Sequence, residues 1–237
     1  MKNKDIPVVI LCGGKGTRTG KISSEIPKPL LKIGLRPILW HVMKIYAAGG
    51  FRRFILCLGH KGNQIESYFK KHNSEKWLIR FVNTGLKASK TQRIAKIKHL
   101  VKEENFFLAY GDDVADIDPG RLLEFHLKNN TIATITVVKM ISDFGIAQIG
   151  KNDKITSFRE KPCLDKWMNG GFMVVNRRIF DFLKAGELEK EVFERLVKIK
   201  QLSAYKHFGQ WKTMNTLKDN IELNAIWKEG KAFWKIW

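Results

Sequence analysis

A glycine-rich turn near the start of the chain constrains its fold more than any other stretch. The apolar run Val8–Leu11 predicts a buried strand, and Gly13, Gly14 and Gly16 follow it almost at once. Because glycines lack side chains, their N–H groups can approach a phosphate closely and adopt positive φ. The spacing matches neither a Walker A loop nor the G-x-G-x-x-G dinucleotide fingerprint. We therefore predict a phosphate-binding loop of another kind; the alternative is a plain strand-to-helix turn.

Two basic residues stand close behind these glycines. Arg18 ends the loop, and Lys28 follows between Pro27 and Pro29. Guanidinium and ammonium groups at the mouth of a glycine loop supply the charge that a polyphosphate needs. The loop and its two cations together predict a cradle for a triphosphate.

The composition is strongly basic, with 43 Lys and Arg against 23 Asp and Glu and a formal net charge of +20. Such a balance favours anionic partners: nucleotides, sugar phosphates, nucleic acid or an acidic membrane surface. The basic residues are spread along the sequence rather than gathered in one stripe, so a solvated lysine-rich surface explains the charge better than a nucleic-acid site. We expect neither nucleic acid nor a membrane as a partner.

The cysteines and the N-terminal residues indicate the cellular compartment. The three cysteines are widely separated and lack metal-ligand spacing, and two of them, Cys12 and Cys57, fall in predicted buried strands. The opening residues 1–5 are too polar for a signal peptide, and no apolar run approaches the ~20 residues that span a bilayer. These features predict a cytoplasmic protein.

Strands and helices alternate along the chain, which predicts an α/β fold. In the first half of the chain, predicted strands and helices alternate. This order predicts a mostly parallel sheet covered by helices on both faces, which is a Rossmann-like three-layer sandwich. Without repeats or linkers, one domain over residues 1–237 is the simplest account. The predicted strands are 7–12, 54–58, 77–82, 106–110, 131–139, 155–158 and 202–205. The predicted helices are 38–46, 64–71, 93–102, 121–129, 179–184, 191–198 and 217–227.

A pair of carboxylates, Asp112 and Asp113, directly follows Gly111 at the end of the predicted strand 106–110. Ligands of parallel sheets gather at the carboxyl ends of the strands. Mg²⁺ takes hard oxygen ligands and commonly only one or two carboxylates beside phosphate oxygens. Next to the phosphate loop, Asp112 is therefore a candidate magnesium ligand; the alternative is a helix cap or turn residue.

Two later segments suggest a site for a phosphorylated sugar. Lys161 stands beside Pro162 and is thus a rigidly placed ammonium group suited to a sugar phosphate. Gly170 and Gly171 would let a sugar ring approach backbone amides. A surface turn with a solvated lysine is the alternative interpretation.

These motifs resemble those of the sugar-phosphate nucleotidyltransferases, and along nearly the whole chain the sequence is similar to the glucose-1-phosphate cytidylyltransferase family. The similarity extends to residues 36–46, 110–112, 114–116, 160–162, 169–172, 211–219 and the aromatic ending 227–237. The resemblance implies a GT-A-like nucleotidyltransferase fold, Mg²⁺ as cofactor, and the reaction of CTP with a sugar 1-phosphate to give a CDP-sugar and pyrophosphate. A sugar-phosphate oxygen would attack the α-phosphorus directly, so that catalysis is alignment and charge neutralisation.

The resemblance also implies roles for individual residues. Arg18 would face the leaving pyrophosphate, Lys28 would counter charge at the α-phosphate and Asp112 would hold Mg²⁺, which makes these three the predicted catalytic residues. The metal would be shared with Asn215. The predicted nucleotide-binding residues are Leu11, Cys12, Gly13, Gly14, Gly16, Thr17, Arg18, Lys28, Arg93 and Gly111. The predicted sugar-phosphate-binding residues are Glu160, Lys161, Asn169, Gly170 and Gly171.

The chain departs from the family pattern at three places around this predicted site. Asn215 stands where the family has a second magnesium-binding Asp, residues 90–93 read Lys-Thr-Gln-Arg instead of Thr-Gly-Gly-Arg, and Ala88 replaces a Ser. An Asn carbonyl can bind Mg²⁺ but brings no charge. A second hypothesis follows, in which the chain binds nucleotide and sugar phosphate but turns over poorly because of Asn215. The choice of CTP over another nucleoside triphosphate, the identity of the sugar and a homo-oligomeric state stay open.

Overall fold

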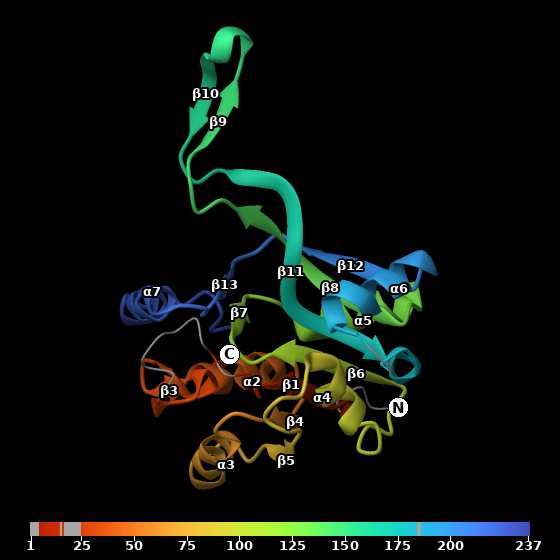
Figure 1. Cartoon of the computed structure of the whole chain (residues 1–237). Coiled ribbons are helices and arrows are strands. Elements are labelled where there is room, and N and C mark those ends of the chain that lie inside the picture. The colour runs from red at the N-terminus through yellow and green to blue at the C-terminus, as the bar shows by residue number, and fades with distance from the viewer. Residues whose placement is uncertain (1–4, 15, 17–24, 184–185) are drawn as a thin grey trace.

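A computed structural model describes residues 5–14, 16, 25–183 and 186–237 of the chain (Figure 1). Its centre is a seven-stranded sheet in the order β12-β8-β11-β6-β1-β4-β5. All neighbouring pairs run parallel except those of β11, which is antiparallel to both β6 and β8. The strands are β1 (Val8–Leu11), β4 (Arg53–Leu58), β5 (Leu78–Asn83), β6 (Asn105–Tyr110), β8 (Ala133–Ile141), β11 (Cys163–Asn176) and β12 (Leu202–His207). The predicted, mostly parallel sheet is confirmed.

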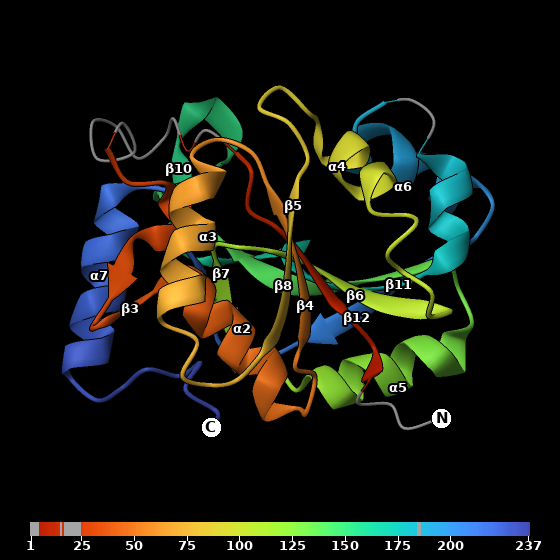
Figure 2. The same ribbon diagram turned by 90° about the horizontal axis from the view of Figure 1, so that it is seen from below.

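The two faces of the sheet carry separate hydrophobic cores because successive side chains of a strand point to opposite faces. Along β1, Val8 and Ile10 pack into one core and Val9 into the other. Helices cover both faces, which makes the three layers that Figure 2 shows from below. The first core receives α2 (Ile38–Ala48), α3 (Gly62–Lys71), α5 (Pro119–Asn129) and α7 (Leu217–Lys228), and the second receives α4 (Lys90–Lys96) and α6 (Phe193–Lys198).

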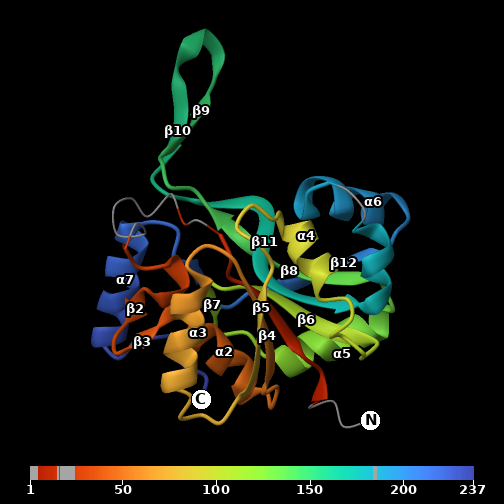
Figure 3. The same cartoon turned by 60° about the horizontal axis from the view of Figure 1, so that its bottom comes forward.

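Short elements lie outside this frame. Two two-stranded sheets flank it, β2 (Lys32–Ile33) with β3 (Arg36–Pro37) and β7 (Asp113–Ala115) with β13 (Trp211–Thr213). A third, β9 (Ile146–Ile149) with β10 (Ile155–Arg159), forms a hairpin that projects from the body of the molecule (Figure 3). Short 3₁₀-helical segments occupy η3 (Lys28–Leu30), η4 (Lys151–Asp153) and η5 (Arg177–Phe182), and η6 (Leu188–Val192) is a π-helical turn.

Two helices and one long strand differ most clearly from the predictions. The helix predicted at 93–102 is α4, which begins at Lys90 because Ser89 and Gln92 form a capping box, and it ends at Lys96. The helix predicted at 179–184 is the 3₁₀ segment η5, whose first turn is capped by the Asn176 side chain. No strand is predicted at 163–176, yet these residues form β11, because its central position between β6 and β8 satisfies the backbone of all three strands. None of the helices in the described part of the chain is long and apolar enough to cross a bilayer.

The C-terminal tryptophans pack around a buried histidine on α2. Trp227, Trp234 and Trp237 have ring centroids 4.9, 6.1 and 6.2 Å from that of His41. The Nε1–H of Trp234 donates to His41 Nδ1 at 3.3 Å, and His41 Nε2 lies 3.0 Å from the carbonyl of Ile33. These partners require a neutral imidazole with its proton on Nε2. Burial correspondingly lowers the pKa of His41 to about 4.

Acid is expected to destabilise the protein through two such histidines. Burial lowers the pKa of His41 and of His126 from 6.5 to about 4. The unfolded chain binds a proton at each below about pH 6.5, whereas the folded chain does so only near pH 4. The free energy of unfolding is therefore highest above pH 6.5 and falls as the pH drops toward 4, by about 1.4 kcal/mol per unit and histidine. The free energy of unfolding, measured with urea at pH 7.5 and at pH 4.5, should therefore differ between the two pH values. The expected difference is about 3 kcal/mol for each of the two histidines.

A matched pair of variants isolates one of these histidines. The ring of His126 contacts Thr134 Oγ1 at 2.8 Å and Asn105 Oδ1 at 3.1 Å, and a glutamine amide can replace both contacts. His126→Gln should remove about half of the acid-dependent loss, whereas His99→Gln, at an exposed position, should leave it unchanged. An equal loss in His126→Gln and the unchanged protein would contradict the assignment.

Candidate active site

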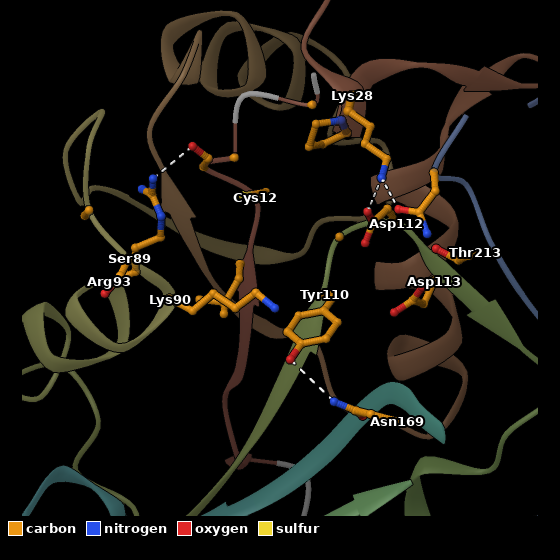
Figure 4. Close-up of a pocket in the computed structure, with 18 of the residues that line it drawn as sticks. Cys12, Lys28, Ser89, Lys90, Arg93, Tyr110, Asp112, Asp113, Asn169 and Thr213 are labelled. Carbon is orange, nitrogen blue, oxygen red and sulfur yellow. Dashed lines mark hydrogen bonds and ion pairs between the residues drawn. The ribbon is translucent and has the colours of Figure 1, made fainter. Parts of the chain in front are cut away.

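A cavity of about 580 Å³ opens at the carboxyl ends of β1 and β6. Its walls come from the glycine loop after β1, the end of β6, α4 with the residues before it, the middle of β11 and the segment around β13 (Figure 4). Ligands of parallel sheets are expected at this edge. The lining residues that were predicted from the sequence are Leu11, Cys12, Gly13, Gly14, Gly16, Lys28, Arg93, Gly111, Asp112, Asn169 and Asn215. Thr17 and Arg18 lie outside the described residues.

The first peptide of the glycine loop is fixed by hydrogen bonds from two other segments of the chain. The Gly13 carbonyl accepts hydrogen bonds from Arg93 Nη2 at 2.9 Å and from the His60 amide at 3.1 Å. Gly13 itself is buried, the next residue, Gly14, is exposed, and Gly16 has a φ of 65°, which favours glycine. Of the predicted loop, Gly13 is therefore anchored at the sheet edge, and Gly14 and Gly16 line the cavity beside it.

Opposite the loop, three residues from distant parts of the chain meet. The Lys28 ammonium donates to Asp112 Oδ2 at 2.5 Å and to Asn215 Oδ1 at 3.0 Å (Figure 4). Lys28 is supplied by η3, Asp112 follows β6, and Asn215 follows β13. Only 11% of the Lys28 side chain and 26% of the Asp112 side chain are exposed, so this ion pair is partly shielded from water. The predicted catalytic Lys28 and Asp112 thus lie together with the predicted metal ligand Asn215.

The oxygens of Asp112 and Asn215 fit a hard divalent cation, because both already converge on one positive charge, the Lys28 ammonium. Within the described ranges no group of three or more His, Cys, Asp or Glu side chains could hold a metal. A magnesium ion here would take one carboxylate and one amide oxygen from the protein, and its other ligands from phosphates and water. This donor set suits a metal that arrives with a nucleotide.

A second carboxyl group, Asp113, lies next to Asp112 in the chain and beneath this cluster, and the sequence pattern alone indicates no role for it. It is 5% exposed, and burial, followed by the nearby Asp112 charge, raises its pKa well above the usual value. A Cβ atom on Gly171, whose φ is +80°, would collide with the Asp113 carboxyl group. Gly171 is therefore needed for packing on Asp113, in addition to any contact with a sugar. The adjacent Asp pair at the strand end is the signal that could have identified this residue.

A polar network closes the cavity on the α4 side. The Tyr110 hydroxyl donates to Glu189 Oε1 at 2.5 Å, and Lys90 forms an ion pair with the same carboxylate while its Nζ lies 4.3 Å from the Tyr110 ring centroid. Asn169 Nδ2 approaches the Tyr110 hydroxyl at 3.5 Å. Burial raises the pKa of Glu189, but the hydrogen bonds from Lys90 and Tyr110 outweigh it and keep the pKa below its usual value. No local pattern reveals this network, because Glu189 is far from the other members in sequence.

The predicted sugar-phosphate residues divide into two groups. Asn169 lines the cavity, and next to it the Gly170 carbonyl accepts a hydrogen bond from Trp211 Nε1 at 2.8 Å. Glu160 and Lys161 follow β10 at the base of the projecting hairpin, are exposed, and do not line the cavity. The structure therefore brings Asn169, but neither Glu160 nor Lys161, to the cluster of Lys28, Asp112 and Asn215.

Comparison with known sequences assigns the chain to a family. The nucleotidyl transferase family pattern matches residues 7–229. A Bacillus subtilis (strain 168) protein named as a probable glucose-1-phosphate cytidylyltransferase is 39% identical over 252 residues, covering 97% of this chain and 99% of its own. The glucose-1-phosphate cytidylyltransferase of Salmonella typhimurium is 36% identical over 254 residues, covering 97% of this chain and 98% of its own.

Solved structures at lower identity share the fold. HddC from Yersinia pseudotuberculosis complexed with GMP-PN superimposes with a TM-score of 0.74 at 21% identity, covering 94% of this chain and 99% of its own. UDP-glucose pyrophosphorylase complexed with UDP-glucose gives a TM-score of 0.73 at 18% identity, covering 95% of this chain and 99% of its own. These similarities confirm the predicted α/β nucleotidyltransferase fold. The chain therefore belongs to the nucleotidyl transferase family, as a glucose-1-phosphate cytidylyltransferase-like member.

Proposed function

We propose that the protein transfers CMP from CTP to a sugar 1-phosphate in a magnesium-dependent reaction, giving a CDP-sugar and pyrophosphate. Two relatives that match nearly the whole chain carry the name glucose-1-phosphate cytidylyltransferase. The observation that carries the proposal is the convergence of Lys28, Asp112 and Asn215 across the cavity from the glycine loop. A cation site beside a phosphate-binding loop is what the transfer of a nucleotidyl group needs.

In the proposed reaction, each group aligns the reactants or neutralises charge. The loop from Gly13 to Arg18 wraps the triphosphate through its N–H groups, and Arg18 faces the pyrophosphate. The Lys28 ammonium lies beside the α-phosphate, where it offsets the negative charge that develops as the sugar-phosphate oxygen attacks. Magnesium, when bound, supplies further charge neutralisation at the phosphate oxygens. Pyrophosphate leaves in line with the attack, and no covalent enzyme intermediate forms.

In this proposal the acceptor occupies the side of the cavity that Asn169 and Trp211 line, next to Gly170. Glu160 and Lys161 bind its hydroxyl and phosphate groups, and this role requires the base of the β9–β10 hairpin to approach the cavity when the acceptor is present. Lysine suits this task because its ammonium is a compact charge on a flexible stem.

A matrix of substrates tests the proposed function. Pyrophosphate release is measured with each of the four common nucleoside triphosphates against several sugar 1-phosphates in the presence of Mg²⁺. The proposal predicts release with CTP and at least one sugar 1-phosphate, and none when Mg²⁺ is chelated. Release with a different nucleotide would correct the base, and no release with any pair would refute the proposed reaction.

A substitution at Asn215 tests whether this residue limits the turnover of the protein. Asn215→Asp adds a charged ligand next to Asp112, and affinity in such sites follows ligand charge. We expect the Mg²⁺ concentration for half-maximal pyrophosphate release to fall about tenfold, with a rise in turnover. Asn63→Asp, an exposed change on α3, adds the same charge away from the cavity and serves as the control. An unchanged Mg²⁺ requirement in Asn215→Asp would show that Asn215 does not limit turnover.

A further inference from the structure

Arg93 makes a set of contacts that the family resemblance alone does not explain. The residue is 5% exposed, and its guanidinium donates to oxygens of three separate segments. Nη1 lies 3.0 Å from the carbonyl of Leu58, 3.0 Å from that of Gly85 and 2.5 Å from Thr84 Oγ1. Nη2 lies 2.9 Å from the carbonyl of Gly13. One side chain thus joins the ends of the neighbouring strands β1, β4 and β5.

The charge of Arg93 has no acidic partner among the described residues, since all four of these acceptors are neutral oxygens. Burial lowers the pKa of the Arg93 guanidinium, because the charged form loses hydration in the interior. A buried, unpaired cation is costly, and its hydrogen bonds to backbone offset only part of that cost. Here the guanidinium lines the cavity next to the first residues of the glycine loop, so its geometry bears directly on that loop.

Two glycines leave room for this guanidinium. A Cβ atom on Gly13 would collide with Arg93 Nη1. A Cβ atom on Gly59 would lie 2.5 Å from the Gly13 carbonyl oxygen and 2.6 Å from Arg93 Nη1. Side chains essentially never approach backbone this closely, so Gly13, Gly59 and Arg93 form one packing unit.

The direction of the Gly13 carbonyl decides how the loop faces a ligand. In a planar trans peptide, the C=O of one residue and the N–H of the next point in opposite directions. Because the Gly13 carbonyl is directed at Arg93 and the His60 amide, the N–H of Gly14 points in the opposite direction, away from these two donors. Gly14 is exposed and lines the cavity.

We propose that Arg93 is a positioning residue, which acts on the nucleotide through Gly13 by fixing the first peptide of the phosphate loop. This inference rests on the proposed function for the identity of the ligand. It departs from the role implied by the family resemblance, in which Arg93 itself binds the nucleotide. The fork of the guanidinium, not its charge, is then what the site requires, because four oxygens accept from its two nitrogens, whereas an ammonium group has three N–H donors on a single nitrogen.

Three variants separate geometry from charge. Arg93→Lys keeps the charge and loses the fork, Arg93→Met loses both, and Gly59→Ala keeps the arginine but displaces it. We expect each to weaken CTP binding about 10- to 100-fold by calorimetry. Turnover at saturating CTP and the KM of the sugar 1-phosphate should stay within about threefold, since a positioning role affects the nucleotide alone. Arg53→Lys, on β4 but away from the cavity, is the control and should bind CTP normally.

Amide hydrogen exchange provides a readout that needs no ligand. In Arg93→Lys and Gly59→Ala, the peptide that contains Gly13 should exchange faster, while peptides from α2 keep the exchange rate of the unchanged protein. Thermal melts identify any variant that fails to fold, and the other two variants then decide the question.

Different results would overturn the inference and the proposed function. Normal CTP affinity in Arg93→Lys together with a loss in Arg93→Met would show that charge is what matters, and would refute the positioning role. Normal affinity in Gly59→Ala would refute it as well. If the unchanged protein binds CTP without releasing pyrophosphate, the proposed reaction fails while the binding test of Arg93 stands. If it binds no nucleotide, hydrogen exchange alone decides the role of Arg93.

Discussion

Lys28→Met is expected to lower kcat for pyrophosphate release by about 10³-fold, the effect of removing one preorganised charge from an electrostatic site. The Lys28 ammonium is the cation held between Asp112 and Asn215, and only 11% of its side chain is exposed. In such a shielded place a single charge interacts strongly with a developing anion. Methionine has a similar length and no charge, so the change removes the interaction while preserving much of the packing.

The same variant has a clear structural control. Lys32→Met changes an exposed lysine on β2 and should retain the activity of the unchanged protein. Both variants are compared by pyrophosphate release at saturating substrates and by circular dichroism, which should be the same for all three proteins. If Lys28→Met kept more than a tenth of the activity, another group would have to neutralise the α-phosphate, and the proposed role of Lys28 would be wrong.

Trp234→Ala is expected to reduce the free energy of unfolding by about 4 kcal/mol, within the range for large buried aromatic residues. The Trp234 side chain is fully buried, packs edge-on against Phe233 and stacks on Trp227 at centroid distances of 4.9 and 6.3 Å. Truncation also leaves His41 Nδ1 without its hydrogen-bond donor inside the core. A domain of this size loses roughly 2–4 °C in Tm for each kcal/mol, so Tm should fall by about 10 °C.

An exposed aromatic residue serves as the comparison. Phe208 is 79% exposed, and Phe208→Ala should change stability by no more than about 0.5 kcal/mol. Trp234→Phe, which fills much of the space, should lie between the two. Equal melting temperatures for Trp234→Ala and Phe208→Ala would show that the C-terminal residues contribute little to the core. The prediction therefore tests whether the aromatic ending is a structural part of the domain.

The acid dependence of stability and the effect of Asn215→Asp concern different parts of the molecule. The first depends on His41 and His126, which lie in the protein interior, and the second on the cavity. Because the sites are separate, their effects should combine additively, and each can be measured without disturbing the other.

The strand and loop that begin the site could be predicted from residues 8–16 because both signals are local. Apolar residues in succession indicate a strand that is buried on both faces, and glycines directly after it indicate a loop that approaches a ligand. The same reasoning predicted Asp112, which directly follows a buried strand. The ends of helices are harder to predict than their existence. The helix α4 begins at Lys90 because of a capping box, and the periodicity of its apolar residues gives no indication of that box.

The positions of Glu160 and Lys161 could not be predicted. The sequence indicates a turn around Pro162, but a turn has no preferred place relative to the rest of a fold. In the structure these residues lie at the base of a hairpin that projects from the body (Figure 1). Their role at the acceptor stays a prediction.

Hydrophobic periodicity, glycine placement and strand-end carboxylates each act over a few residues, so the class of fold and the predicted position of a glycine loop and a carboxylate at one sheet edge could be derived from the sequence alone. Three features required the folded chain: the meeting of Lys28 with Asp112 and Asn215, the contacts of Arg93 with three strand ends, and the burial of Asp113, which raises its pKa. These contacts join residues up to 187 positions apart. They follow from the order of the strands across the sheet, for which the local sequence carries no signal.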